Sequence, residues 1–116
     1  MKAAMEAAAG AGALVYGHAS HVYHTGANLY MIFHVDAGQA SEVESRYRAV
    51  LDAALPACMA TGGTLTHHHG VGLGKRDYIR EELGDGGLDL LRRIQRAVDP
   101  RATHEPWQAR RDRALM

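Results

Sequence analysis

The chain has few of the features that would place it in a specialised class of protein. It has 116 residues, one cysteine, three prolines and a formal net charge of zero. A single cysteine excludes an intrachain disulfide and any zinc framework built from several thiolates. Balanced charge and scarce aromatic residues argue against a nucleic-acid partner, so we interpret the arginines from Arg92 onward as a solvated face and tail.

Long apolar runs are also lacking. No run reaches the ~20 residues that a membrane-spanning helix needs. Residues 1–12 are rich in alanine and have neither the basic leader nor the strongly apolar middle of a secretory signal. We therefore expect no transmembrane segment and a cytoplasmic location. Cys58 falls in an apolar helical stripe, which favours a core position over a nucleophile.

The patterns that are present alternate between helical and extended. Residues 1–9 predict a helix, which ends at the glycines that follow. Residues 13–23 have strand composition, and residues 28–35 alternate strictly between apolar and polar faces. Turn residues separate the two runs, at 24–26. They predict an antiparallel hairpin.

A helical period then runs from Ser41 to Cys58. Ser41 followed by Glu44 fits a capping box. Pro56 lacks a backbone donor, so we expect it to bend the helix or end it early.

The remaining predicted elements are a short strand at 64–66, a glycine-rich loop at 71–75, and helices at 77–83 and 88–98, the last of them burying Leu91, Ile94 and Val98. Beyond them, Trp107 is a candidate anchor in a polar tail. This order predicts an α+β fold, with a small antiparallel sheet made of the long hairpin and the short strand, and with helices packed on one face.

Two glycine-flanked segments hold most of the histidines. Residues 17–26 read GHASHVYHTG, and residues 62–72 read GGTLTHHHGVG. Both lie at predicted strand ends, where loops present functional groups. A triple histidine in mid-chain is not an affinity tag, because tags are appended at termini.

A zinc site is one interpretation of these segments, with His18 and His21 joining the triple. Successive residues of a strand point to opposite faces, so His67 and His69 could share a site that His68 would not easily join. Neither segment contains a carboxylate to complete the ligand set. We predict no metal.

Tyr23 is a candidate base. A phenol in water loses its proton only near pH ~10, so a catalytic tyrosine needs cations close by. On residue type alone, a plain strand aromatic is the favoured interpretation, as for Tyr16, Tyr30 and Tyr47.

Both histidine segments resemble patterns of the alkyldihydroxyacetonephosphate synthase family. The letters HASHVY at 18–23, with Gly26 and Tyr30 following, resemble its His-x-Ser-His-x-Tyr-x-x-Gly-x-x-x-Tyr pattern. Residues 62–72 resemble its glycine-flanked triple histidine. The similarity continues to residue 100 and so covers nearly the whole chain.

The resemblance implies the vanillyl-alcohol oxidase group of flavoproteins. Its members bind FAD in a separate N-terminal domain and cover it with a C-terminal cap built on an antiparallel sheet. Residues 1–116 would then be a single domain, a partial cap without the flavin-binding domain. The synthases exchange the acyl chain of acyl-dihydroxyacetone phosphate for a fatty alcohol, in ether lipid biosynthesis.

The resemblance also implies roles by position. Tyr23 matches the family's proton-abstracting tyrosine, and residues 67–69 match its active-site histidines, which bind the cofactor near the substrate. His18 and His21 would orient that tyrosine, contact the substrate or fill polar core positions. The implied partners are a small-molecule or lipid-like substrate and either a second copy of the chain or an FAD-binding domain.

The broader relatives are FAD-linked glycolate and D-lactate dehydrogenases. They have Glu-His-Gly where the chain has His68-His69-Gly70, and Tyr30 stands where their second metal-binding histidine is expected. Both departures favour the synthase-like branch. Three alternatives stay open: a fragment of a 2-hydroxy acid dehydrogenase, a non-catalytic stand-alone dimerisation module, and a histidine-rich metal protein.

Overall fold

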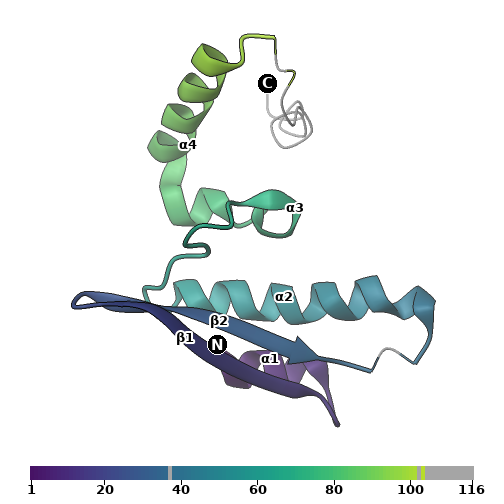
Figure 1. Cartoon of the computed structure of the whole chain (residues 1–116). Coiled ribbons are helices and arrows are strands. Elements are labelled where there is room, and N and C mark those ends of the chain that lie inside the picture. Colours follow the sequence, from purple (N-terminus) through teal and green to yellow (C-terminus); the bar gives the residue numbers. More distant parts are fainter. Residues whose placement is uncertain (37, 102, 104–116) are drawn as a thin grey trace. The chain divides into compact units, whose positions relative to one another are not determined.

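The computed structural model describes residues 1–36, 38–101 and 103 (Figure 1). Trp107, the predicted anchor, lies outside them. The chain forms two compact units, Met1–His68 and His69–Met116, and each is described by itself. The elements of the first unit are α1 (Lys2–Ala9), β1 (Leu14–Tyr23), β2 (Gly26–His34), a short 3-10 helix (Ala40–Glu42) and α2 (Val43–Met59).

The sheet of the first unit is the predicted hairpin. β1 and β2 pair antiparallel, with Val15 opposite Phe33 and His18 opposite Tyr30. Turn-forming residues after Tyr23 let the chain reverse within two residues, so that Tyr23 pairs with Gly26.

A small apolar core joins the hairpin to the two helices, which lie on one face of it (Figure 1). Val15 is 7% exposed and Val50 of α2 is fully buried. Alternation along β2 turns Met31 and Phe33 toward the same core. The core residues are Met5, Ala9, Val15, Val50 and Ala54, with Met1, Ala13, Met31, Phe33 and Val35 packed against them. The α+β prediction with helices on one face is confirmed.

Three local predictions are wrong. Residues 64–66 form no strand, so the described sheet has two strands. The helix α2 continues past Pro56 to Met59, because a proline in the last turn removes only one intrahelical bond. Ser41 lies inside the 3-10 helix, and no side chain caps the start of α2.

The second unit contains α3 (Gly72–Lys75) and α4 (Ile79–Val98). The predicted loop at 71–75 is therefore wrong, because residues 72–75 form a single helical turn. Gly84 has φ 65° and ψ 175° and breaks α4 in two, as the predicted stop at this glycine requires. Leu91, Ile94 and Val98, predicted to be buried, are 52%, 55% and 80% exposed, because this unit has no buried residue among those described. Within the described ranges, no helix is long and apolar enough to cross a membrane.

Candidate active site

The segment that carries the triple histidine is tied to the end of α2. The Thr61 hydroxyl donates to the Cys58 carbonyl (2.7 Å), and the Cys58 thiol donates to the Thr64 carbonyl (3.5 Å). Gly63 lies against Cys58 so closely that a Cβ there would be 2.7 Å from the sulfur. Leu65 is buried next to these contacts. Cys58 thus has a structural role, and the segment leaves α2 in a defined direction.

Two histidines of this segment contact the turn end of the hairpin. The Tyr30 hydroxyl is 2.8 Å from Nε2 of His68, and Nδ1 of His67 is 2.8 Å from Nδ1 of His68. The His21 ring centroid lies 5.2 Å from that of His67 and 5.3 Å from that of His68. The Tyr23 ring is 6.2 Å from His67. We call these five residues the histidine–tyrosine cluster.

A β-bulge in β1 places His21 in the cluster. The register passes from Ser20 opposite Asn28 to Tyr23 opposite Gly26, so β1 has one extra residue there. His21 has φ 47° and is the only non-glycine residue with positive φ in the described part of the chain. Its Nδ1 is 3.1 Å from the Ser20 hydroxyl, which holds the ring. Sparsely populated backbone conformations of this kind concentrate at functional sites.

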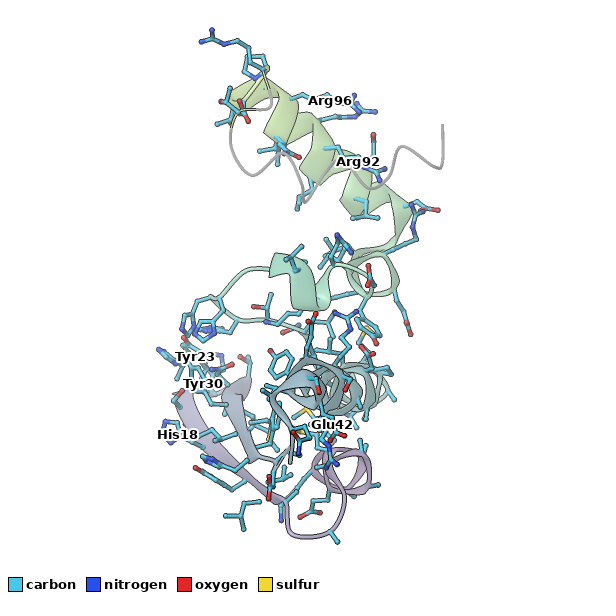
Figure 2. All side chains as sticks on the ribbon, turned by 90° about the vertical axis from the view of Figure 1, so that its right-hand side faces the viewer. His18, Tyr23, Tyr30, Glu42, Arg92 and Arg96 are labelled. Atoms are coloured by element: carbon cyan, nitrogen blue, oxygen red, sulfur yellow. The ribbon has the colours of Figure 1, made fainter. Side chains whose placement is uncertain are left out.

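The cluster opens to solvent and is rich in neutral hydrogen-bonding groups. His21, His67 and His68 are exposed, and Tyr23 is 54% exposed. Figure 2 labels Tyr23 and Tyr30 near the turn end of the hairpin, with His18 further along it. The His18 ring lies 5.9 Å from that of Tyr30, so it borders the cluster. Imidazole and phenol groups can bind oxygen atoms of a substrate or stabilise developing charge.

The geometry corrects one step of the sequence reasoning about metals. His68 contacts His67 directly, because residues 66–69 do not form a strand and strand alternation does not apply. Within the described ranges, His21, His67 and His68 each offer a nitrogen, and these three atoms lie within 4.8 Å of one another. That spacing would allow a shared metal ion, and the absence of a metal stays a prediction.

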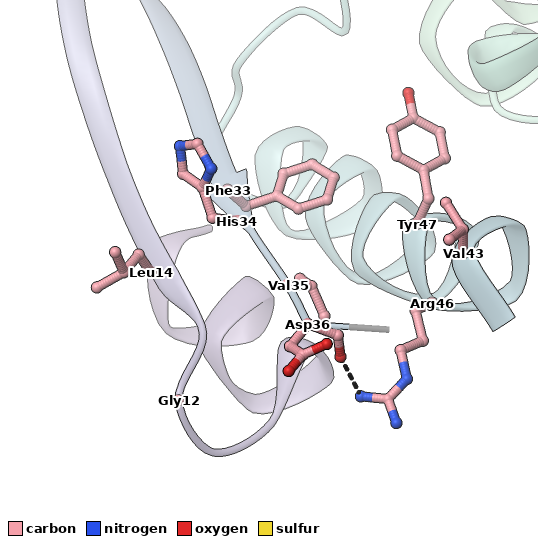
Figure 3. Close-up of a pocket in the computed structure, with 9 residues that line it drawn as sticks. All are labelled: Gly12, Leu14, Phe33, His34, Val35, Asp36, Val43, Arg46 and Tyr47. Carbon is pink, nitrogen blue, oxygen red and sulfur yellow. Dashed lines mark hydrogen bonds between the residues drawn. The ribbon is translucent and has the colours of Figure 1, made fainter. Parts of the chain in front are cut away.

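A separate hollow lies at the other end of the hairpin. It has a volume of about 480 Å³ and is lined by Leu14, Phe33 and neighbouring residues of α2 (Figure 3). Arg46 donates to the Asp36 carbonyl there (3.0 Å). None of its lining residues belongs to the histidine–tyrosine cluster. The catalytic groups predicted from the sequence therefore point to the cluster and not to this hollow.

His69 is the first residue of the second unit, and its predicted role in cofactor binding stays a prediction. The same unit holds the segment GVGLGK, whose last four residues form α3 and in which Gly70 and Gly72 have positive φ. The Lys75 ammonium is 3.4 Å from the Gly70 carbonyl. Burial lowers the pKa of Lys75, and the Glu82 carboxylate partly offsets that change.

The structure brings together four of the residues chosen from the sequence: His21, Tyr23, His67 and His68. Sequence reasoning missed Tyr30, for which it favours a plain strand aromatic. A usable signal existed, because antiparallel pairing of the two predicted strands would place Tyr30 near the histidines of the first strand. Its bond to His68 depends on the fold of residues 61–67, which no local pattern predicts.

Comparison with known proteins identifies the family. A sequence profile described as "FAD linked oxidases, C-terminal domain" matches residues 1–106. A mitochondrial D-lactate dehydrogenase (cytochrome) of Saccharomyces cerevisiae is 42% identical over 57 residues, covering 49% of this chain and 10% of the relative. The alkyldihydroxyacetonephosphate synthase of Trypanosoma brucei brucei is 33% identical over 90 residues, covering 77% and 14%. That of Caenorhabditis elegans is 32% identical over 81 residues, covering 70% and 14%.

The chain therefore belongs to the family of FAD-linked oxidase C-terminal domains. No solved structure matches it significantly. The chain spans 10% to 14% of the length of these relatives, which include both synthases and dehydrogenases. FAD, the predicted cofactor, is the cofactor of the family. The exposed cluster of imidazoles and phenols fits one wall of a flavin site, because side chains of these types donate hydrogen bonds to a bound group and accept them from it.

Proposed function

We propose that the chain forms part of the active site of an FAD-dependent enzyme of the alkyldihydroxyacetonephosphate synthase type. The observation that carries the proposal is the histidine–tyrosine cluster, in which Tyr23 lies beside hydrogen-bonded His67 and His68. The substrate would be acyl-dihydroxyacetone phosphate, whose acyl chain is exchanged for a fatty alcohol.

Each residue of the cluster has a role in this proposal. Tyr23, as its phenolate, removes a proton from the substrate carbon and becomes the neutral phenol. His67, His68 and His69 bind the cofactor near the substrate. His18 and His21 orient the substrate and the tyrosine. FAD, when bound, supplies the electron-accepting chemistry that these side chains lack.

A dehydrogenase acting on a 2-hydroxy acid is the second candidate. The 42% identity with the yeast D-lactate dehydrogenase favours it, although the match covers only 49% of the chain. The trypanosome synthase match covers 77%. The triple histidine, with His68 in place of the dehydrogenases' glutamate, supports the synthase type further.

The experiment that separates the two uses the natural full-length protein that carries this chain, loaded with FAD. It is assayed for exchange of the acyl chain by a fatty alcohol, and for oxidation of D-lactate and glycolate with an artificial electron acceptor. Exchange without oxidation supports the synthase type. Oxidation without exchange supports the dehydrogenase. The absence of both activities would contradict both candidate functions.

The catalytic role of Tyr23 is tested in the same protein. We expect Tyr23→Phe to lower turnover by roughly 10²–10⁴-fold, the usual contribution of a positioned acid–base group. Tyr16→Phe is the matched control, because Tyr16 also bonds a histidine (His34, 3.1 Å) on the hairpin but lies outside the cluster. Unchanged turnover in Tyr23→Phe would remove the assigned role.

Organisation and location remain proposals. We infer that residues 1–116 act as one domain, a partial cap that pairs with an FAD-binding domain or with a second copy. The cytoplasmic location stays a prediction, and the yeast relative is named mitochondrial.

A further inference from the structure

A continuous hydrogen-bonded chain runs from Tyr30 to His67. The Tyr30 hydroxyl bonds Nε2 of His68, and Nδ1 of His68 bonds Nδ1 of His67, each at 2.8 Å. Both ring nitrogens of His68 are thus engaged. The Tyr30 side chain is half-buried and pairs with the His18 ring across the strands, which holds the hydroxyl in place.

The two bonds determine each other's direction. A neutral imidazole has one N–H donor and one acceptor nitrogen. If Tyr30 donates to Nε2 of His68, then His68 carries its proton on Nδ1 and donates to Nδ1 of His67. Neutral His67 then carries its proton on Nε2. In the reverse direction, Nε2 of His67 is left with a lone pair.

The acidities of the groups select the first direction. A phenol is a stronger acid than the N–H of a neutral imidazole, and an imidazole nitrogen is a stronger base than a phenol oxygen. In the direction that these acidities favour, the Tyr30 hydroxyl donates. His67 presents an N–H, and not a lone pair, from the ring that lies beside Tyr23.

We propose that Tyr30 is a positioning residue that sets the tautomer of His68 and, through it, of His67. The function of this arrangement rests on the proposed function of the site. With Tyr23 as the base, an N–H on His67 can stabilise negative charge on the phenol oxygen or on a substrate oxygen. Tyr23 then accepts the proton and His67 stabilises the charge, so the two residues do not compete for one proton.

The tautomers can be measured on the chain without flavin or substrate. The chain is labelled with ¹⁵N-histidine, and long-range ¹H–¹⁵N NMR shows which ring nitrogen carries the proton, above pH ~8 where ordinary histidines are neutral. We expect the proton of His68 on Nδ1 and that of His67 on Nε2. Tyr30→Phe removes the donor, and we expect the shifts of both rings to move toward an average of the two tautomers.

Tyr16→Phe is the matched control. It removes a tyrosine hydroxyl that bonds Nε2 of a histidine on the same hairpin, but the partner is His34. We expect this variant to change the signals of His34 and to leave those of His67 and His68 unchanged. Comparable changes at His67 and His68 in both variants would indicate a general loosening of the hairpin and would overturn the proposal.

Two further results would overturn it: a His68 that carries its proton on Nε2 in the unmodified chain, or a Tyr30→Phe chain with unchanged tautomers. If Tyr30→Phe does not fold, the tautomers of the unmodified chain still decide. The test is independent of the proposed function. If activity survives Tyr23→Phe, the assignment of Tyr23 as the base is wrong, but the measured tautomers of His67 and His68 are unaffected.

Discussion

His21 adopts a backbone conformation that ordinary residues avoid. A positive φ places its Cβ close to the following carbonyl, which costs about 1 kcal/mol relative to glycine. The same conformation sends the ring toward His67 and His68. The conformation therefore lowers local stability and places the imidazole ring in the cluster.

A glycine substitution tests both effects of the His21 conformation. We expect His21→Gly to raise the free energy of unfolding by about 1 kcal/mol, because glycine adopts positive φ without strain. Turnover of the flavin-loaded protein should fall, since the ring is lost from the cluster. Denaturant unfolding measures the change in stability, and the activity assay measures the change in turnover.

The control is His18→Gly, at a regular ladder position opposite Tyr30. Glycine in a strand interior weakens the strand, so this change should lower stability. If both substitutions shift stability in the same direction, strain at His21 is not the cause.

Lys75 makes stability depend on pH. Its pKa lies below the ordinary 10.5 in the folded chain, mainly because of burial. Between the lowered pKa and 10.5 the unfolded chain binds more protons, so the free energy of unfolding should rise with pH across that window. Denaturant unfolding at about pH 8 and at about pH 10.5 should show a smaller rise for Lys75→Gln than for the unmodified chain. Equal rises would contradict the prediction.

At the residue scale, most members of the cluster could be predicted from the sequence, but the contacts between them could not. Tyr23, His67 and His68 could be chosen because their motifs are specific. The bond between Tyr30 and His68 could not be predicted, because it joins residues 38 positions apart. The positive φ of His21 could not be predicted either, since histidine has no preference for positive φ strong enough to indicate it.

Among the elements, the turn after α2 determines where the triple histidine lies. Gly63→Ala would place a Cβ 2.7 Å from the Cys58 sulfur and 3.2 Å from the Cys58 carbonyl oxygen. We expect it to lower the free energy of unfolding by roughly 1–3 kcal/mol, as overpacking does. Loss of the ¹H–¹⁵N signature of the His67–His68 bond should accompany it.

A double-mutant cycle isolates the contact. In a Cys58→Ala background the sulfur is absent, so Gly63→Ala should cost less, with a remainder from the carbonyl oxygen. Gly86→Ala is the control, because a Cβ added at Gly86 would meet nothing within 4 Å and alanine favours helix. An equal cost in both backgrounds would show that the sulfur contact is not responsible.

Element prediction succeeded where a period extends over many residues. The hairpin and α2 each have one. It failed at 64–66, where Thr-Leu-Thr has strand propensity but the bonds to Cys58 hold a turn. The predicted burial of Ile94 and Val98 failed for a different reason. An amphipathic pattern identifies an apolar face without identifying what covers it.

At the scale of the whole molecule, one face of the hairpin is exposed in the part of the chain that the structure describes. Leu14 is 64%, Tyr16 46% and Ile32 37% exposed, and a two-stranded sheet is marginal by itself. We expect the chain to self-associate with rising concentration in analytical ultracentrifugation, and Ile32→Lys to weaken the association. Val98→Lys is the control on α4, 80% exposed. If only Val98→Lys weakens association, the contact surface lies on α4.

The bulge in β1 also determines the face of the sheet on which Tyr23 lies. From Val15 to Ala19, odd-numbered residues share the face of Val15, and uninterrupted alternation would place Tyr23 with them. The extra residue resets that count just before the tyrosine. Deleting Val22 would therefore yield a more regular ladder and leave Tyr23 opposite Gly26, on the side where it now emerges. A homologous chain of the same length that paired without the bulge would keep every motif letter and present its tyrosine to the opposite side.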